Sequence, residues 1–398
     1  MLQIISTLRR HRTATLLIVL EIALTCAIVC NAIFLIRERL ARMDQPSGVA
    51  ESELLRVRLT GIGTQDNAAV ITQQDLAALR TIPGVKAATS INMVPFGGSS
   101  WNTGVSITRD DPSAEDNVGL YLGRDLISTL GLTLIAGRDF TPEEYIDIDD
   151  EKAVPKQVIV TKGLADHFYP NQSPLGKPLY ASGKEPQTIV GVVDRIARPN
   201  SAFGDAGHAV LLPAALSYTT GGTYVLRVDP TRADAVLAAV DQTLSKVDPN
   251  RLVLTHETFE QTRRDHFKQD RSMAYLLAGV AIALLVITAL GVVGLASFWV
   301  QQRTRQIGVR RALGATKRDI LRYFQLENFI LATAGIVIGM GLAFGINQWL
   351  MHAYEVKRLP SSFLPIGAVL LWFLGQIAVL GPALRASTIP PAIATRTV

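Results

Sequence analysis

Charged residues and cysteine are scarce in this chain of 398 residues, and each shortage excludes a class of protein. Only 18% of the residues are charged, whereas soluble globular chains carry about 25%. Two cysteines are too few for a disulfide scaffold or a cysteine-based zinc module. Because 48% of the residues are hydrophobic and the mean hydropathy is +0.25, the composition argues against an ordinary cytosolic enzyme.

Motifs that bind nucleotides or metals are also missing. Neither Gly-Lys pair, at 176–177 and at 183–184, is followed by Ser or Thr, so the chain has no phosphate-cradling loop. Gly61-x-Gly63 lacks the third glycine of a dinucleotide-binding turn, and the six histidines form no H-E-x-x-H. We therefore predict no enzyme activity, cofactor or metal in this chain. A hydrolytic site at Asp166-His167 stays open, because a triad cannot be read from sequence alone.

Four long apolar runs are present instead, at Thr13–Ile36, Met273–Val300, Phe329–Leu350 and Phe363–Leu384. Each has roughly 22 residues or more, and a helix needs about 20 to cross the hydrocarbon core. Unpaired backbone groups are too costly in lipid, so the runs are predicted to be helices. The first run is too long for a signal peptide and no A-x-A pattern follows it, so we interpret it as a permanent anchor.

The basic residues are concentrated in three short segments beside these runs. Residues 1–13, 301–322 and 385–398 carry net charges of +3, +6 and +2, whereas the whole chain carries +5. The rest of the chain is therefore acidic. Short flanks rich in Lys and Arg stay in the cytoplasm, which places both termini inside. The basic charge thus reports topology and predicts no nucleic-acid partner.

The fold predicted from this pattern is a membrane protein with four transmembrane helices and a large α+β periplasmic domain between helices one and two. The segments are a cytoplasmic amphipathic start (1–13), helix one (14–36), the periplasmic domain (37–272), helix two (273–300), a cytoplasmic coupling segment (301–322), helix three (323–350), a periplasmic loop (351–361), helix four (362–384) and a cytoplasmic tail (385–398).

Within the periplasmic domain, two strand–helix–strand patterns far apart in sequence are expected to pair into one split α/β lobe, at about 52–95 and 215–256. They comprise strands at 54–59, 85–93, 224–228 and 252–254, a helix from Thr72 to Thr81 and an amphipathic helix from Ala233 to Val247. The stretch between them, about 96–214, is predicted to be an inserted β-rich lobe. Residues 37–50 and 257–272 are predicted to form a stalk, with helices one and two extending into it through Met43 and from Phe259.

Polar and small residues inside the apolar runs point to helix–helix contacts. Glu21 lies near mid-depth of helix one, where a charge costs about 2.5–3.5 kcal/mol or more. We expect it to be protonated or to make an intramembrane polar contact with another helix; a proton or substrate relay is the alternative. Helix three carries Gly335-x-x-x-Gly339 and Gly341-x-x-x-Gly345, a spacing that allows close approach.

The coupling segment contains more than a positive-inside loop needs. Gly314 is suited to end one helix in a left-handed conformation, and Thr316 with Asp319 forms a capping-box pattern that starts the next. A short basic helix with apolar positions Ile307 and Leu313 is therefore predicted on the cytoplasmic side. A loop that only fixes orientation is the alternative.

At this segment the chain resembles the MacB/FtsX-type permeases of ABC transporters, whose pattern is roughly R-x-x-E-I-G-I-R-R/K-A-x-G-A. Residues 307–315 match it well, while Gln306 replaces the usual Glu and so removes a possible ion pair. The likeness extends to residues 130–140, 174–177 and 189–193, which are similar to stretches of the MacB-like periplasmic domain.

The resemblance implies a permease that works in pairs and is driven by a separate ABC ATPase docked on the cytoplasmic side of a bacterial inner membrane. In tripartite members, a periplasmic adaptor and a TolC-like outer-membrane channel complete the machine. The residues that this likeness assigns to ATPase docking are Arg305, Gln306, Ile307, Gly308, Arg310, Arg311, Ala312, Leu313, Gly314 and Ala315.

Four functions remain open at this stage. We expect a permease that couples ATP hydrolysis to periplasmic movement and efflux. The alternatives are a lipoprotein-releasing permease, a non-transporting FtsX-like regulator of cell-wall hydrolases, and a membrane-anchored sensor without an ATPase. The size of the external domain, about 235 residues, argues against the regulator.

Overall fold

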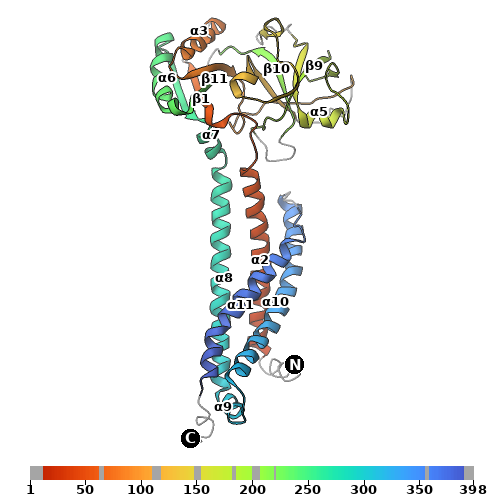
Figure 1. The fold of residues 1–398 in the computed structure, drawn as a ribbon, viewed down its shortest axis with the longest axis vertical. Coiled ribbons are helices and arrows are strands. Elements are labelled where there is room, and N and C mark those ends of the chain that lie inside the picture. Colours follow the sequence, from red (N-terminus) through yellow and green to blue (C-terminus); the bar gives the residue numbers. More distant parts are fainter. Residues whose placement is uncertain are drawn as a thin grey trace. The chain divides into compact units, whose positions relative to one another are not determined.

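The computed structural model describes residues 12–61, 67–109, 118–147, 154–181, 185–199, 207–218, 221–354 and 358–389. The chain forms two compact units. The helical unit contains residues 1–44 and 269–398, and the sheet unit contains residues 45–268. Figure 1 shows the helices and strands of each. The predicted amphipathic start lies outside the described residues, except for its last two positions.

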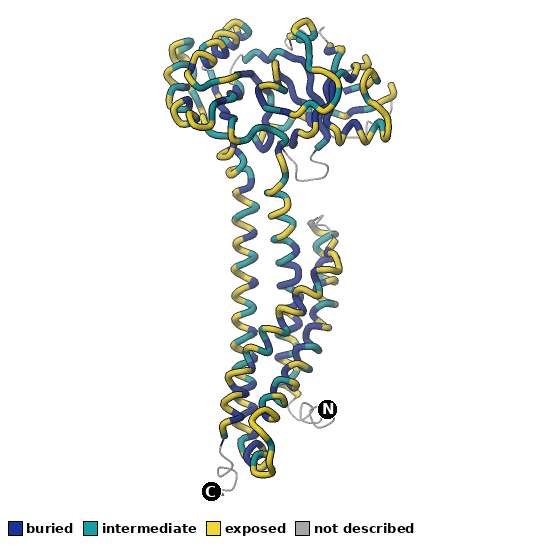
Figure 2. Tube along the Cα trace, viewed as in Figure 1, coloured by how far each residue is buried: buried dark blue, intermediate teal, exposed yellow. Residues whose placement is uncertain are grey.

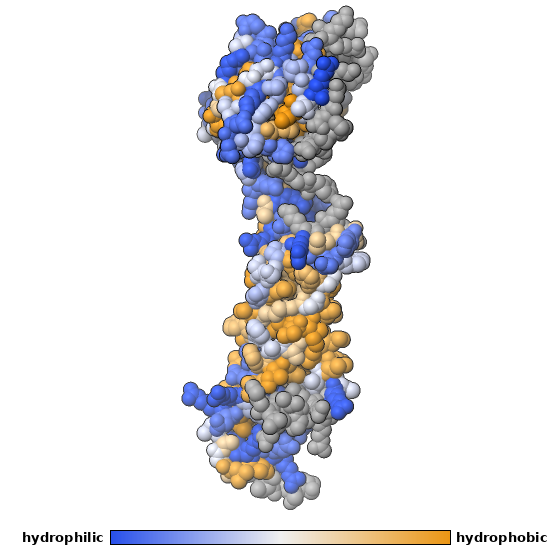
Figure 3. Space-filling model, turned by 90° about the vertical axis from the view of Figure 1, so that its right-hand side faces the viewer, coloured by the Kyte–Doolittle hydropathy of each residue, from blue (hydrophilic) through white to orange (hydrophobic). Residues whose placement is uncertain are grey.

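All four predicted apolar runs are helical. The long helices are α2 (Arg12–Met43), α8 (Lys268–Gln302), α10 (Lys317–Tyr354) and α11 (Phe363–Ser387), and the short helix α9 (Thr304–Ala312) follows α8. The long helices are long and apolar enough to cross a membrane, and apolar surface covers the middle of the helical unit in Figure 3. They extend beyond the apolar runs by up to a few turns at their polar ends.

Helix α2 is the centre of the helical unit. In Figure 2 it is largely buried, whereas α8 is mostly exposed along its apolar stretch. Polar side chains fasten α2 to its neighbours: the hydroxyls of Thr25 and Thr288 lie 2.8 Å apart, and Asn31 Nδ2 donates to the Ala343 carbonyl at 3.0 Å. Such bonds stabilise helix contacts where water is absent.

The first glycine pair of helix three contacts α2, and the second does not. A Cβ added at Gly335 or Gly339 would lie 2.8 Å or less from side-chain atoms of Ile22 or Cys26. At Gly341 and Gly345 an added Cβ would meet nothing within 4 Å. Two pairs with the same spacing therefore have different surroundings.

This difference predicts unequal effects of the same substitution. Gly339→Leu should push α10 away from α2 and cost about 2–3 kcal/mol, because overpacking a close contact strains both helices. Gly341→Leu is the matched control and should cost less than about 0.5 kcal/mol. Thermal stability of the detergent-purified chain, followed by size-exclusion chromatography, measures both. Equal losses in the two variants would contradict the packing described.

The sheet unit is built on one sheet with the order β12-β1-β11-β2-β4-β10-β7-β9-β5. The strands are β1 (Leu54–Gly61), β2 (Val85–Ile91), β3 (Asn102–Thr103), β4 (Val118–Gly123), β5 (Leu134–Gly137), β6 (Ile146–Asp147), β7 (Gln157–Thr161), β8 (Pro178–Leu179), β9 (Gln187–Val193), β10 (Ala209–Ala215), β11 (Gly221–Val228) and β12 (Arg251–Thr258). Its helices are α3 (Ala68–Arg80), α4 (Leu126–Leu130), α5 (Lys162–Phe168), α6 (Ala233–Val247) and α7 (Phe259–His266).

Strands from the two ends of the sheet unit lie side by side. β1 pairs antiparallel with both β11 and β12, and β11 pairs with β2. α3 and α6 pack on these strands around a core that includes Leu79, Leu226 and Val236. The prediction for α6 is confirmed at both ends. α3 begins at Ala68 rather than at Thr72. Thr72 is therefore an interior residue of the helix, and its hydroxyl accepts from the Tyr218 N–H at 3.1 Å.

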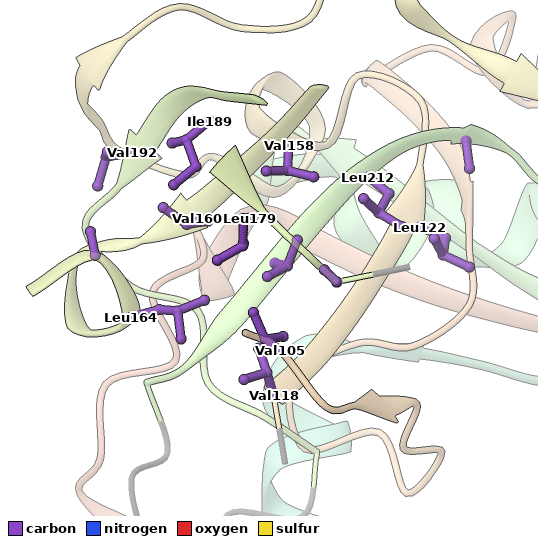
Figure 4. Packing of buried hydrophobic residues seen from close by; sticks show 14 of the residues in the cluster. Val105, Val118, Leu122, Val158, Val160, Leu164, Leu179, Ile189, Val192 and Leu212 are labelled. Atoms are coloured by element: carbon purple, nitrogen blue, oxygen red, sulfur yellow. The ribbon is translucent and has the colours of Figure 1, made fainter. Parts of the chain in front are cut away.

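The predicted inserted lobe has its own core, but its described strands belong to the same sheet as the rest of the unit. Figure 4 shows the valines and leucines that fill this core between β4, β7, β9 and β10. The boundary predicted near residue 96 is not an edge of the sheet, because β2 on one side of it pairs with β4 on the other, at Ile91 and Gly123. The lobe also contains parallel pairs and two helices, since β7 pairs parallel with β9 and β4 with β10.

One of the family-like stretches forms a structural corner. Gly137 has φ +76°, and an added Cβ would lie 2.2 Å from the Val190 carbonyl oxygen. Next to it, Arg138 donates to both oxygens of Glu144, at 2.8 and 2.6 Å. This pairing holds the pKa of Glu144 below its usual range. The similarity around residues 130–140 therefore reflects a turn that fixes backbone geometry.

The two predicted stalk helices differ. α2 runs to Met43 as expected, whereas the stretch from Phe259 to Ser272 is not one helix. It breaks at Phe267, which has φ −90° and ψ 11° and a buried ring. The break was missed because the stretch contains no Pro or Gly; the ring of Phe267 packs on Phe96, a contact that local sequence does not reveal.

Candidate functional site

The predicted coupling segment contains a short helix with the expected ends. α9 covers Thr304–Ala312, and Gly314 follows it at φ +102°, a value that favours glycine. Asp319 Oδ2 accepts from the Thr316 N–H at 2.9 Å, and Thr316 Oγ1 accepts from the Asp319 N–H at 3.2 Å. The two residues thus form the predicted capping box at the start of α10.

The ten residues assigned to docking do not share one environment. Leu313 is 84% exposed and Val309 beside it is 45% exposed, so apolar surface is presented to solvent. Ile307 and Gly308 are buried against the rest of the helical unit. The exposed members of the set are Arg305, Gln306, Arg310, Ala312, Leu313 and Gly314, and the half-buried ones are Arg311 and Ala315.

Two arginines of α9 also contact their own chain. The Arg310 guanidinium lies 5.0 Å from the centre of the Tyr323 ring, and Arg311 Nη1 donates to the Ile389 carbonyl at 2.7 Å. Ile307 packs into a cluster with Ile320 and Phe324 of α10. These contacts hold α9 on the helical unit and leave Arg305 and Leu313 facing outward.

Sequence reasoning missed an ion pair beside this helix. Arg303, the residue between α8 and α9, is buried, and its Nη1 lies 3.0 Å from each carboxylate oxygen of Glu327 in α10. Glu327 is 1% exposed. The signal was present, because a Glu inside the span predicted at 323–350 needs a partner. Which residue supplies that partner depends on the packing of the helices.

Glu21 contacts a neighbouring helix through glycine. A Cβ added at Gly291 of α8 would lie 2.7 Å from Glu21 Oε2, so the carboxyl group packs directly on that backbone. Within the described part of the chain, no side chain donates a hydrogen bond to it. The carboxyl group therefore contacts another helix, but the predicted polar contact is not found among the described residues.

Two models of known families match this chain. A model of the MacB-like periplasmic core domain matches residues 15–243, more than half of the chain. A model of the FtsX-like permease C-terminal matches residues 278–391, which include α9 and the capping box at the start of α10. The chain is a MacB/FtsX-type permease of ABC transporters. It is thus a membrane permease with a periplasmic core domain.

Several relatives of the permease carry related names. It is 27% identical over 289 residues to a macrolide export ATP-binding/permease protein MacB of Bartonella henselae, covering 69% of this chain and 41% of that protein. It is 23% identical over 331 residues to the uncharacterized ABC transporter permease YknZ of Bacillus subtilis, covering 82% of this chain and 79% of that protein. The chain therefore spans well under half the length of the MacB relative.

Two solved structures resemble the permease weakly. The periplasmic region of MacB from Actinobacillus actinomycetemcomitans matches with a TM-score of 0.37 and 13% identity, covering 56% of this chain and 97% of that one. The extracellular domain of YknZ from Gram-positive bacteria matches with a TM-score of 0.33 and 15% identity, covering 50% and 100%. Membership of the family rests on the sequence matches.

Proposed function

We propose that this permease transmits force between a separate ABC ATPase and its sheet unit. ATP-driven closure of the ATPase moves α9, the long helices carry the movement across the membrane, and the sheet unit expels cargo from the periplasmic side of the inner membrane. One observation carries this proposal: α9 presents Leu313 and Arg305 to solvent while Ile307 anchors it to the helical unit. A loop that only set orientation would need charge alone.

The polar groups of the helical unit support transmission rather than passage through the bundle. Thr25 and Thr288 bond each other, Asn31 bonds the Ala343 carbonyl, and the Asn347 side chain accepts from the Leu359 N–H at 2.8 Å. These four side chains are engaged within the helical unit and so do not contribute to a polar pathway, which transporters with a midplane binding site need. Cargo then moves outside the bundle.

The complete machine that we propose has further parts. Both termini and α9 are cytoplasmic and the sheet unit is periplasmic, in agreement with the basic flanks. A second permease copy or a paralogue completes the membrane part, and a periplasmic adaptor with a TolC-like channel extends it across the outer membrane. The name of the MacB relatives, macrolide export protein, favours efflux over lipoprotein release. Cell-wall regulation and sensing remain the further alternatives.

Leu313→Asp tests ATPase docking directly. The side chain is 84% exposed, so the variant should fold and insert normally. A charge in the centre of a docked apolar contact should weaken association with the ATPase at least about tenfold. Pull-down of the ATPase by the full-length chain from membranes, with Lys317→Glu as an exposed control, measures this. Undiminished association of Leu313→Asp would count against docking at α9, and absence of any ATPase with the unchanged chain would favour a sensor.

A further inference from the structure

Arg303 opens the family-like motif, yet it does not lie on the exposed face of the coupling segment. It is 8% exposed, whereas Arg305 two residues later faces solvent. Besides its bonds to Glu327, the guanidinium lies 5.3 Å from the centre of the Trp299 ring. A buried and neutralised arginine contributes little to membrane orientation, which depends on charges near the water. It also cannot bind a docked ATPase directly.

The backbone of Arg303 belongs to two helices at once. Its N–H donates to the Trp299 carbonyl at 3.1 Å, in the last turn of α8, and its carbonyl accepts from the Ile307 N–H at 2.9 Å, in the first turn of α9. Because its side chain bonds Glu327 of α10, three helices meet at this one residue. The pair is largely shielded from solvent, because its side chains are only 9% and 2% exposed.

We propose that Arg303 and Glu327 are positioning residues, and that their ion pair is the fixed point through which a displacement of α9 reaches α8 and α10 together. The inference rests on the proposed function, because it assigns a role within the same coupling segment. Besides the apolar packing of Ile307, the other polar links of α9 are more open to solvent, since Arg310 is exposed and Arg311 is half-buried. Breaking a buried pair leaves an uncompensated charge, so α9 should detach from α10.

Thiol labelling in membrane vesicles tests the attachment without any ATPase. In a full-length chain carrying Ile307→Cys, the new thiol is buried, and the native Cys26 and Cys30 are fully buried. Arg303→Glu or Glu327→Arg alone should speed labelling by a membrane-permeant maleimide about tenfold, and the two together should return it to within about threefold of the starting rate. Arg305→Glu is the matched control, because it changes the same charge without a buried partner.

Coupling is read with the ABC ATPase that co-purifies with the chain. Each single reversal should keep ATPase binding within about threefold but lose the effect of the permease on ATP turnover, and the double reversal should restore that effect. A double reversal no better than the singles, or singles that behave like the unchanged chain, overturns the inference. If no ATPase co-purifies, the proposed function fails while the labelling still decides the attachment.

Variants of similar size to the native residues provide a second test if the charge-reversed proteins are not produced in the membrane. Glu327→Gln keeps a hydrogen-bond acceptor, and Arg303→Lys keeps the charge but loses the contact with Trp299. Both should raise labelling of the Ile307→Cys thiol by about two- to threefold. Labelling that stays unchanged in both variants contradicts a positioning role for the pair.

Discussion

Replacing Asp75 with alanine is expected to lower the free energy of unfolding of the sheet unit by about 3–5 kcal/mol, because it removes the bidentate partner of a largely buried cation and leaves that cation only a 3.3 Å contact with Asp248. Asp75 lies on α3 and is 0% exposed. Its carboxylate accepts from both terminal nitrogens of Arg251, with Nη2 at 2.6 Å, and from the Tyr224 hydroxyl at 2.8 Å. Burial lowers the pKa of Arg251, which shows how poorly this cation is solvated.

Hydrogen exchange in the detergent-purified chain measures this loss. Backbone amides of β11 should exchange about two to four orders of magnitude faster in Asp75→Ala, since protection of a core strand follows the unfolding free energy. Lys86→Ala is the control, because it removes a solvent-exposed ion pair in which Lys86 Nζ lies 3.5 Å from Glu53 Oε2. Its loss should cost no more than about 1 kcal/mol. Similar effects of the two variants would show that the Asp75 pair is not buried in solution.

Phe96→Ala should destabilise the sheet unit by about 3–5 kcal/mol, because it empties the centre of an aromatic cluster. Phe96 is 2% exposed, and its ring centre lies 5.1 Å from that of Phe267 and 6.3 Å from that of Phe259. The Arg263 guanidinium lies 5.1 Å from the same ring centre. The cluster thus fixes α7, the last element of the sheet unit before α8.

The backbone of Phe96 supplies a second readout. Its φ of +62° is a conformation that costs a residue with a side chain roughly 1–2 kcal/mol and suits glycine. Phe96→Gly loses the same ring but relieves this cost, so it should be about 1 kcal/mol more stable than Phe96→Ala. Chemical unfolding of both variants, followed at Trp101, makes the comparison. An alanine variant as stable as the glycine variant would contradict the strained conformation.

Variants of Asp75 and Phe96 distinguish unfolding of the sheet unit from loss of coupling in the helical unit. Asp75 and Phe96 belong to residues 45–268, whereas Leu313, Arg303 and Glu327 belong to the other unit. Under the proposed function, loss of export in the Asp75 and Phe96 variants should accompany unfolding of the sheet unit. Loss of export in the variants of the helical unit should occur with the sheet unit intact, which is the outcome that the proposed force transmission predicts.

Local sequence patterns were sufficient for the four long helices and for α9, but not for the start of α3 or the break at Phe267. The length of the apolar runs predicted α2, α8, α10 and α11, because a bilayer requires about 20 apolar residues in a form that satisfies its own backbone. The ends of α9 and the start of α10 followed from Gly314, Thr316 and Asp319, since left-handed caps and capping boxes depend only on neighbours in the chain. The coupling segment was found in this way.

Contacts between distant residues were decided only by the tertiary structure. Gly335 and Gly339 have the same spacing as Gly341 and Gly345, yet only the first pair meets α2. The two pairs lie on different faces of α10, and packing decides which face contacts α2. The continuous sheet and the ion pair between Arg303 and Glu327 likewise join segments that are separate in sequence. No local pattern of residues predicts which of these segments will pair. By itself the sequence determined which stretches form the four long helices and where α9 ends; packing decided the break at Phe267 and which helical residues face one another.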